Sequence, residues 1–239
     1  MLSWLELVGS YARLAWLSAR IVLHRKLVFM TLAAVAYYAG QYAFAVLRPG
    51  EGFGVGEALY VLVEVPGVLA AVYLSMDLVP GERQRRTLET LYATSSTQRQ
   101  VWLVRVAAVC AVLVMAILAL SLTAYLCFAE FPWVAGGLNA AVPALLFASL
   151  TLYLSIAWRS ANAAAMLSLA SLVVILLAAA SLEGTAWFPF IKYFAPPMGT
   201  DAALWAETAL ANRLVLIATA GLLLHLALQR LDRRERLLT

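Results

Sequence analysis

Ionisable side chains within apolar stretches are the first candidates for chemistry in this sequence. Glu64 and Asp77 fall within one such stretch, and we interpret Asp77, near its end, as interfacial. A carboxylate in hydrocarbon costs about 2.5–3.5 kcal/mol, so Glu64 is expected to face other helices or a wet cavity. Two interpretations are open. Either Glu64 and Pro66 line a translocation path, or Glu64 is protonated or hydrogen-bonded to a neighbouring helix and Pro66 only kinks its own helix.

The remaining reactive residue types do not show the spacing of a catalytic or metal site. His225 has no second ligand at a suitable spacing, so we interpret it as structural. Cys110 and Cys127 lie in apolar runs without a CxxC pair, which favours buried free thiols over a disulfide. The sequence contains no phosphate-loop, H-E-x-x-H or G-x-S-x-G motif. We therefore expect no catalytic residue, no metal site and no cofactor in this chain, and no enzymatic activity of its own.

The elements that must position these residues are membrane spans. Of the 239 residues, 64% are hydrophobic and 13% are charged, against about 25% charged in a soluble domain. A soluble globule of this length cannot hide so much apolar surface. The composition therefore predicts an all-α integral membrane protein, with residues 1–239 forming a single domain.

Six stretches are apolar and long enough to be candidate spans of about 20 residues. In chain order they are Leu27–Leu47, Ala58–Val79, Val106–Ala129, Leu138–Trp158, Ala161–Leu182 and Leu214–Gln229. The last is short, and we expect that it can start near Trp205 with Arg213 snorkelling outward. Residues 1–26 have polar positions at helical spacing, which favours an interfacial helix on the cytoplasmic side over the start of a longer first helix.

The basic residues are distributed unevenly between the two sides. With six spans, 14 of the 17 lysines and arginines lie on the side of the termini, and only Arg48, Lys192 and Arg213 lie on the other. The positive-inside rule then predicts that both termini are cytoplasmic. The net charge of +4 reflects basic loops facing an anionic leaflet, so no nucleic-acid partner is expected.

The loop between the second and third spans, residues 80–100, holds the most detailed pattern. Pro80 and Gly81 end the span, and an apolar edge at i, i+3 and i+4 within 88–92 predicts a short amphipathic helix. Thr97 and Gln100 fit a capping box that starts the next helix. From the pattern alone, the alternative is a solvated basic loop that only anchors the topology.

This stretch resembles the signature loop of type-2 ABC exporter permeases, typically E-R-x-x-G-T-L-E-x-L-L, then T-P, then S-R-x-Q and a hydrophobic residue. The matching residues are Gly81 to Leu91, Ala93-Thr94-Ser95 and Arg99-Gln100-Val101. The chain departs from the family at Arg86 in place of Gly, Ser95 in place of Pro and Arg105 in place of Lys. The position of the loop after the second span also agrees with the family.

The resemblance implies that the chain is the transmembrane subunit of an ABC exporter in the inner membrane of a prokaryote. In that family the loop is a coupling helix, which sits in a groove of a separate ATPase that binds ATP and Mg. The role is carried onto Glu82, Arg83, Arg85, Arg86, Thr87, Leu88, Glu89 and Leu91. A homodimer, or a heterodimer with a paralogue, is expected to surround the path in membrane lipid. The substrate class is lipid-like, glycan or hydrophobic small molecule.

Residues 183–212 are too interrupted by proline and charge for a span, yet too apolar for a hydrated loop. The resemblance implies an outer re-entrant helical hairpin before the last span. Its candidate residues are Phe190, Tyr193, Phe194, Pro196 and Pro197. The alternative is a surface loop capped by an aromatic belt at the headgroups.

Two other functions are weighed against the exporter subunit. The first is a non-transporting membrane subunit that uses the same loop to anchor an ATPase to a larger assembly. The second, less favoured, is a membrane-embedded lipid-modifying enzyme, which the missing acid–base and metal groups speak against.

Overall fold

The structure is a computed structural model, and it describes residues 4–47, 54–81, 98–182, 185, 187–196 and 200–232. These residues contain helices and connecting turns, with no strand among them. In chain order the elements are α1 (Trp4–Leu47), α2 (Val55–Ala58), the π-helix η1 (Leu59–Glu64), α3 (Val65–Ser75), α6 (Gln98–Cys127), α7 (Trp133–Trp158), α8 (Ala161–Leu177), α9 (Ala179–Leu182) and α10 (Ala202–Asp232).

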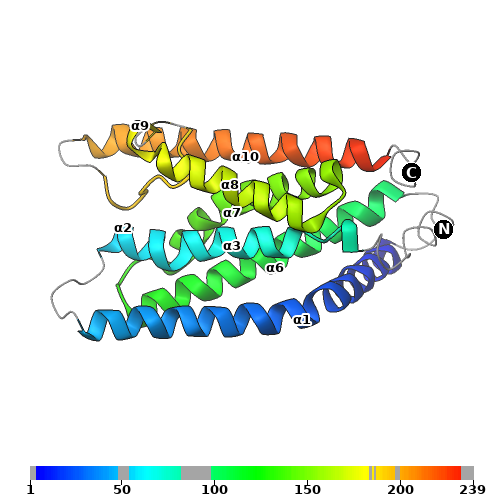
Figure 1. The fold of residues 1–239 in the computed structure, drawn as a ribbon, viewed down its shortest axis with the longest axis horizontal. Coiled ribbons are helices and arrows are strands. Elements are labelled where there is room, and N and C mark those ends of the chain that lie inside the picture. The colour runs from blue at the N-terminus through cyan, green and yellow to red at the C-terminus, as the bar shows by residue number, and fades with distance from the viewer. Residues whose placement is uncertain are drawn as a thin grey trace.

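The long helices lie side by side along one axis of the molecule (Figure 1). The start of α1 and the end of α10 lie at the same end of the bundle, together with the α7–α8 turn (Figure 1). α7 is the central helix, because it packs against α3, α6, α8 and α10.

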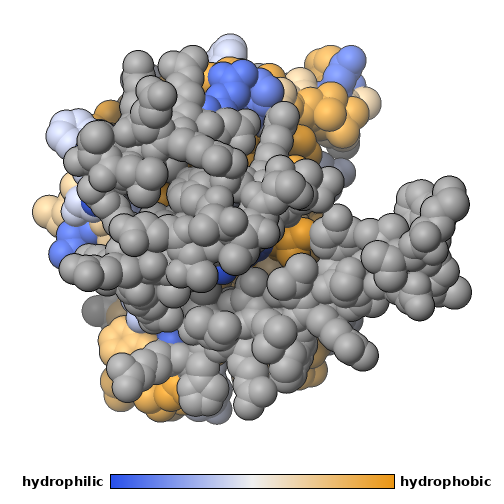
Figure 2. Space-filling model, turned by 90° about the vertical axis from the view of Figure 1, so that its right-hand side faces the viewer, coloured by the Kyte–Doolittle hydropathy of each residue, from blue (hydrophilic) through white to orange (hydrophobic). Residues whose placement is uncertain are grey.

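The long helices of the bundle have the length and the exposed apolar side chains of membrane spans. In the described parts of the chain, five helical stretches are long and apolar enough to cross a membrane: Lys26–Leu47, Val55–Ser75, Trp102–Cys127, Trp133–Trp158 and Ala203–Leu231. α8 is apolar but shorter, at 17 residues or about 25 Å. Large apolar side chains are exposed along α1, α6, α8 and α10. Viewed along the long axis, apolar residues appear at several places around the periphery (Figure 2). The chain is therefore an all-α membrane protein, as the composition predicted.

Several boundaries differ from those expected. The last helix begins at Ala202, twelve residues before Leu214, so the short last span is wrong and the earlier start is confirmed. The fourth span was expected to begin at Leu138, but its helix α7 already begins at Trp133. The first described residue of the helix after the basic loop is Gln98, and Thr97 of the expected capping box lies outside the described residues, so that cap stays a prediction.

Gly136 and Gly137 lie within α7, where their lack of a side chain brings neighbouring helices close. A Cβ atom at Gly136 would lie 2.8 Å from Leu59 Cδ2, and one at Gly137 would lie 2.9 Å from Leu118 Cδ2. Small residues that admit close backbone approach are typical of helix contacts in membranes. The missing side chains of these glycines thus allow α7 to pack closely against η1 and α6.

The turn between α7 and α8 is as tight as expected. α7 ends at Trp158 and α8 begins at Ala161, and Arg159 between them has a left-handed φ of 54°. Ser160 caps α8, since its hydroxyl accepts a hydrogen bond from the Ala163 N–H at 3.3 Å. Two residues are therefore enough to reverse the chain.

Two expectations from the sequence stay predictions. Residues 4–47 form one continuous helix, whose dark-blue N-terminal part is inclined to the remainder (Figure 1). The interfacial position of residues 1–26 is therefore still a prediction. The eight candidate coupling residues between Glu82 and Leu91 lie outside the described residues.

The segment before the last span is not a helical hairpin in its described residues. Residues 187–196 form turns and irregular backbone, and α9 and α10 flank them. Pro189 and Pro196 lack the N–H that a helix interior requires, and several carbonyls between them bond to side chains instead. The helical part of that expectation is wrong for these residues, whereas Pro197 lies outside the described ones.

Candidate functional site

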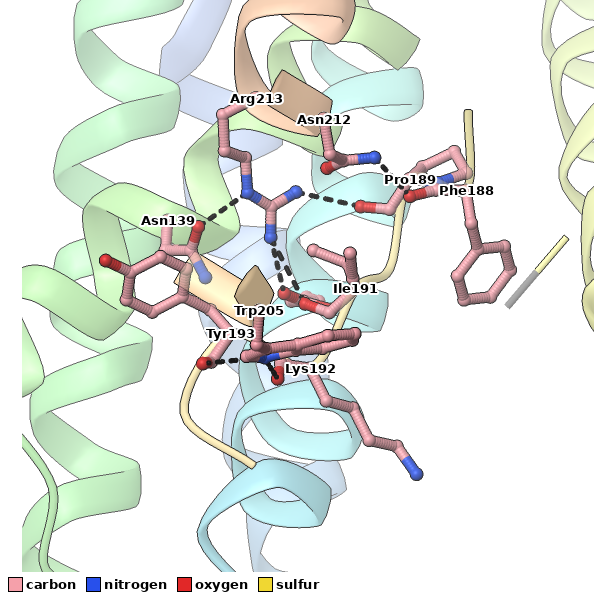
Figure 3. Close-up of polar contacts among 10 residues, drawn as sticks. Asn139, Phe188, Pro189, Ile191, Lys192, Tyr193, Trp205, Asn212 and Arg213 are labelled. Atoms are coloured by element: carbon pink, nitrogen blue, oxygen red, sulfur yellow. Dashed lines mark hydrogen bonds and ion pairs between the residues drawn. The ribbon is translucent and has the colours of Figure 1, made fainter. Parts of the chain in front are cut away.

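A buried arginine forms the polar centre of the bundle. Arg213 lies on α10 and is 7% exposed. Its Nε donates to Asn139 Oδ1 on α7 at 2.6 Å, and its two terminal nitrogens donate to the carbonyls of Pro189 at 2.9 Å and Ile191 at 3.4 Å (Figure 3). The planar guanidinium therefore joins α7, α10 and the 187–196 segment through one rigid fork.

Arg213 is also the ionic partner of Glu64. The Arg213 Nη2 and Glu64 Oε1 atoms lie 3.7 Å apart, and Glu64 is 5% exposed. The expectation that Arg213 snorkels outward is wrong, because a charge this far inside the bundle is stabilised by an opposite charge and by carbonyls rather than by water. For Glu64, the pair favours the second interpretation, a partner on a neighbouring helix, and its place on a translocation path stays a prediction.

The 187–196 segment depends on α10 for its hydrogen bonds. Asn212 Nδ2 donates to the Phe188 carbonyl at 2.7 Å, and Trp205 Nε1 lies 3.2 Å from the Lys192 carbonyl and 3.3 Å from the Tyr193 carbonyl (Figure 3). Irregular backbone at membrane depth is tolerated only where protein supplies such donors. Asn212 lies ten residues, about 15 Å, along α10 from its first residue, so the segment runs back into the bundle.

Pro66 explains the π-helix that ends at Glu64. Proline has no N–H, so it cannot donate to Leu62 in an α-helix or to Val61 in a π-helix. The N–H of Val65 donates to the Tyr60 carbonyl, five residues back, which is the π pattern. Position 66 therefore supplies no donor to the Val61 carbonyl in the π register, nor to the Leu62 carbonyl in an α register.

Two adjacent tyrosines on α1 supply the missing donors. The Tyr37 hydroxyl donates to the Val61 carbonyl at 2.8 Å, and the Tyr38 hydroxyl lies 2.7 Å from the Leu62 carbonyl. The Tyr38 hydroxyl also lies 2.9 Å from the Leu120 carbonyl on α6. The first span thus holds the irregular turn of the second span in place.

The predicted aromatic residues of the 187–196 segment divide into a buried and an exposed group. Phe190 is buried and meets the Tyr60 ring edge-on, with ring centres 5.6 Å apart. Tyr193 is exposed and contacts Phe194, with ring centres 5.0 Å apart. Pro196 lies at the end of the described segment. Phe190 therefore packs the segment against η1, directly beside the turn that carries Glu64.

A second ionic contact holds the other end of the second span. Lys26 on α1 pairs with Asp77 and donates to the Tyr73 carbonyl at 2.7 Å. Lys26 is buried, and its ammonium lies 4.9 Å from the centre of the Tyr73 ring. Asp77, interpreted as only interfacial, therefore joins the first and second spans four residues before Gly81.

Sequence reasoning missed Arg213, Tyr37, Tyr38 and Asn212 as partners in this site. The sequence did contain a signal for these partners. Glu64 and Arg213 are opposite charges in two apolar stretches, and Pro66 indicates a backbone carbonyl without an N–H donor. Cys127 is exposed on the bundle, so the expectation of a buried thiol is wrong there. His225 lies 2.8 Å from Gln229 on the same helix.

The described residues hold no group of three or more His, Cys, Asp or Glu side chains arranged for a metal ion. What they provide is a hydrogen-bonded and ionic junction among the second span, α7, α10 and the 187–196 segment. Comparisons of the chain with known protein families, with characterised proteins and with solved structures find no match.

Proposed function

We propose that this chain is the transmembrane subunit of an ABC exporter and works with a separate ATPase. The observation that carries the proposal is the stretch from Gly81 to Val101, with its E-R…T-L-E-x-L core, directly after the second span. A short helix with charges of both signs and an apolar edge is suited to docking on a soluble partner. The finer topology belongs to the same proposal: six spans, an N-terminal interfacial helix and both termini in the cytoplasm of a prokaryote.

The geometry of the second span supports this assignment. The end of α3 and the start of α6, which flank the loop in the sequence, lie at the end of the bundle where α1 begins and α10 ends (Figure 1). The Lys26–Asp77 pair ties the span to α1 close to the loop. Force applied to the loop therefore reaches a span that is fixed to its neighbours rather than a loose connector.

In the proposed cycle, ATP and Mg bind to the partner ATPase, and closure of two such subunits pushes on the two coupling loops. Two copies of this chain, or one copy and a paralogue, surround the path. The substrate is a lipid-like molecule, a glycan or a hydrophobic small molecule. This chain contributes the coupling loop, the spans and the 187–196 segment, which we place at the outer end of the path.

Charge reversal in the loop tests the coupling role. The chain is co-expressed with a candidate phosphate-loop ATPase from the same genome, purified and reconstituted in lipid nanodiscs. Simultaneous Arg83→Glu, Arg85→Glu and Arg86→Glu changes are expected to lower co-purification of the ATPase and its lipid-stimulated ATP hydrolysis at least tenfold, because they invert the charge of the docking helix. Thermal unfolding of the chain is expected to stay unchanged.

A matched control reverses three arginines on the same predicted side but outside the loop. Arg233→Glu, Arg234→Glu and Arg236→Glu together change the net charge by the same amount. This control is expected to keep ATPase binding and hydrolysis within twofold of the parent. Equal losses in both triple variants, or unchanged binding in the loop variant, would refute the proposal.

The anchoring subunit shares the loop and differs in its use. ATP-driven flux of a fluorescent lipid across liposomes that contain the complex separates the two functions. Flux that depends on the loop arginines supports an exporter, whereas binding and hydrolysis without flux of any tested substrate class support an anchor.

A further inference from the structure

The 187–196 segment is tied to α10 at two levels. At the first level Trp205 binds the carbonyls of Lys192 and Tyr193, and at the second Asn212 and Arg213 bind those of the 188–191 stretch. The levels are seven to eight residues apart on α10, or about 11 Å along the helix. The second level also involves the second span, through Glu64.

Arg213 is shared among three partners that lie on different elements. Its fork bonds Asn139 on α7 at 2.6 Å and the Pro189 carbonyl at 2.9 Å, and it faces Glu64 at 3.7 Å. Since the guanidinium is planar and rigid, its orientation cannot change for one partner without changing for the others. A displacement of Glu64 therefore acts on the hydrogen bonds that hold the 187–196 segment.

Glu64 ends a turn of the second span whose helical register is not fixed by its own backbone. Pro66 cannot donate to Val61 in the π register or to Leu62 in an α register, and the hydroxyls of Tyr37 and Tyr38 lie 2.8 and 2.7 Å from these two carbonyls. Changing this turn from π to α alters the register by one residue, which rotates one half of the span against the other by about 100°. Such a rotation carries the Glu64 carboxylate away from Arg213.

We infer that the Glu64–Arg213 pair is the release point of the 187–196 segment. While Glu64 and Arg213 are paired, Arg213 stays bonded to the Pro189 and Ile191 carbonyls. Separation of the pair frees these two carbonyls, while Asn212 still binds the Phe188 carbonyl and Trp205 still binds those of Lys192 and Tyr193. Arg213 is then the positioning residue for the segment, and Glu64 is the residue through which the second span controls it. The inference concerns contacts within one chain, so it stands or falls independently of any ATPase.

The accessibility of a buried thiol in the segment tests this inference. Ile191 is 2% exposed and packs with Trp205 and Ala209, so a cysteine there is shielded while the segment is held. The Ile191→Cys chain, with Cys110 and Cys127 changed to alanine, is placed in nanodiscs and labelled with a membrane-impermeant maleimide. Glu64→Gln keeps the shape of the side chain and removes its charge. It is expected to raise the labelling rate at least fivefold.

Two further variants separate release from general loosening. Arg213→Gln is expected to raise the labelling rate as Glu64→Gln does, and the double variant is expected to label no faster than the faster single variant, because both act through one contact. Thr151→Ala removes a buried hydrogen bond between α7 and α8, to Ser168 at 2.8 Å, and is expected to leave labelling within twofold.

The labelling rates test the inference even when the Arg213→Gln variant does not fold. Should Arg213→Gln fail to fold, Glu64→Gln decides alone, because it replaces one oxygen by a nitrogen and leaves the packing intact. An acceleration below fivefold in Glu64→Gln would overturn the inference. An equal acceleration in Thr151→Ala would overturn it too, because labelling would then report loss of stability rather than release.

Discussion

At the scale of single residues, the contact between α1 and the second span follows from the missing N–H of Pro66. Pro66 lacks an N–H, and the Val61 and Leu62 carbonyls take hydroxyl donors from Tyr37 and Tyr38 instead. A buried carbonyl without a donor costs about 1–3 kcal/mol. Each hydroxyl is therefore expected to contribute more to stability when proline occupies position 66 than when a residue with an N–H does. The tyrosine pair and the proline thus form one structural unit, although 28 and 29 positions separate Tyr38 and Tyr37 from Pro66.

A double-mutant cycle tests this dependence. Tyr38→Phe is expected to lower the free energy of unfolding by about 1–3 kcal/mol in the parent chain, because the Leu62 carbonyl loses its donor. In the Pro66→Ala background the cost is expected to fall by about 1 kcal/mol, since an alanine at position 66 can donate an α-helical N–H to that carbonyl. Unfolding of purified protein in mixed detergent micelles measures both steps.

The control for that cycle is another tyrosine on α1. Tyr42 is exposed, and its ring meets the edge of Phe128. Tyr42→Phe is expected to change the unfolding free energy by less than about 0.5 kcal/mol in either background. A Tyr38→Phe cost that is the same in the parent chain and in the Pro66→Ala background would show that the hydroxyl does not stand in for the missing N–H.

At the scale of elements, the second span is held on three sides. Lys26 on α1 pairs with Asp77 at one end, and Arg213 on α10 pairs with Glu64 thirteen residues away. α7 adds a third contact, because it packs closely against η1 at Gly136. The span is therefore a helix fixed by contacts at both ends with one irregular π-turn, and we expect any bending of the span to occur at that turn.

A bulky side chain at Gly136 is expected to disturb this support. A Cβ there would lie 2.8 Å from Leu59 Cδ2 and 3.1 Å from Cε2 of the Phe131 ring, so Gly136→Leu overpacks the contact of α7 with η1. The expected loss of unfolding free energy is about 1–3 kcal/mol. Thermal unfolding in detergent, followed by intrinsic tryptophan fluorescence, is the measurement.

Gly221 on α10 supplies the matched control, because no atom of another described element lies within 4 Å of a Cβ built there. Gly221→Leu is expected to leave stability unchanged or to raise it by up to about 1 kcal/mol, as leucine is the better helix former. If Gly136→Leu is as well tolerated as Gly221→Leu, the close contact between α7 and η1 does not support the second span.

At the scale of the whole molecule, composition and periodicity predicted the class of fold and most of the spans. They succeed because a span is a property of about 20 consecutive residues, which a window average captures. They failed for the short last span from Leu214, for the outward position of Arg213 and for the helical 187–196 segment, where the outcome depends on distant partners. Arg213 lies within a helix that begins at Ala202, and its charge is tolerated there because Glu64, Asn139 and two carbonyls surround it.

The same limit explains how the candidate site was partly predicted. Glu64 was identifiable from its charge in an apolar stretch, and the need for a partner followed from the cost of burying it. Which residue would pair with it was not identifiable, because 149 positions separate Glu64 from Arg213 and no local pattern links them. The coupling loop, in contrast, was proposed from a local motif and from its position in the chain.

We propose above that the loop between the second and third spans docks on a nucleotide-hydrolysing partner at the cytoplasmic side. Site-specific photo-cross-linking from position 88, in cells that also produce a candidate phosphate-loop ATPase from the same genome, tests it most directly. The account predicts a covalent adduct with that ATPase whose yield changes when ATP is depleted, and no such adduct from position 234. An adduct from position 234 alone, or labelling of position 88 from the outer face of intact cells, would contradict the account.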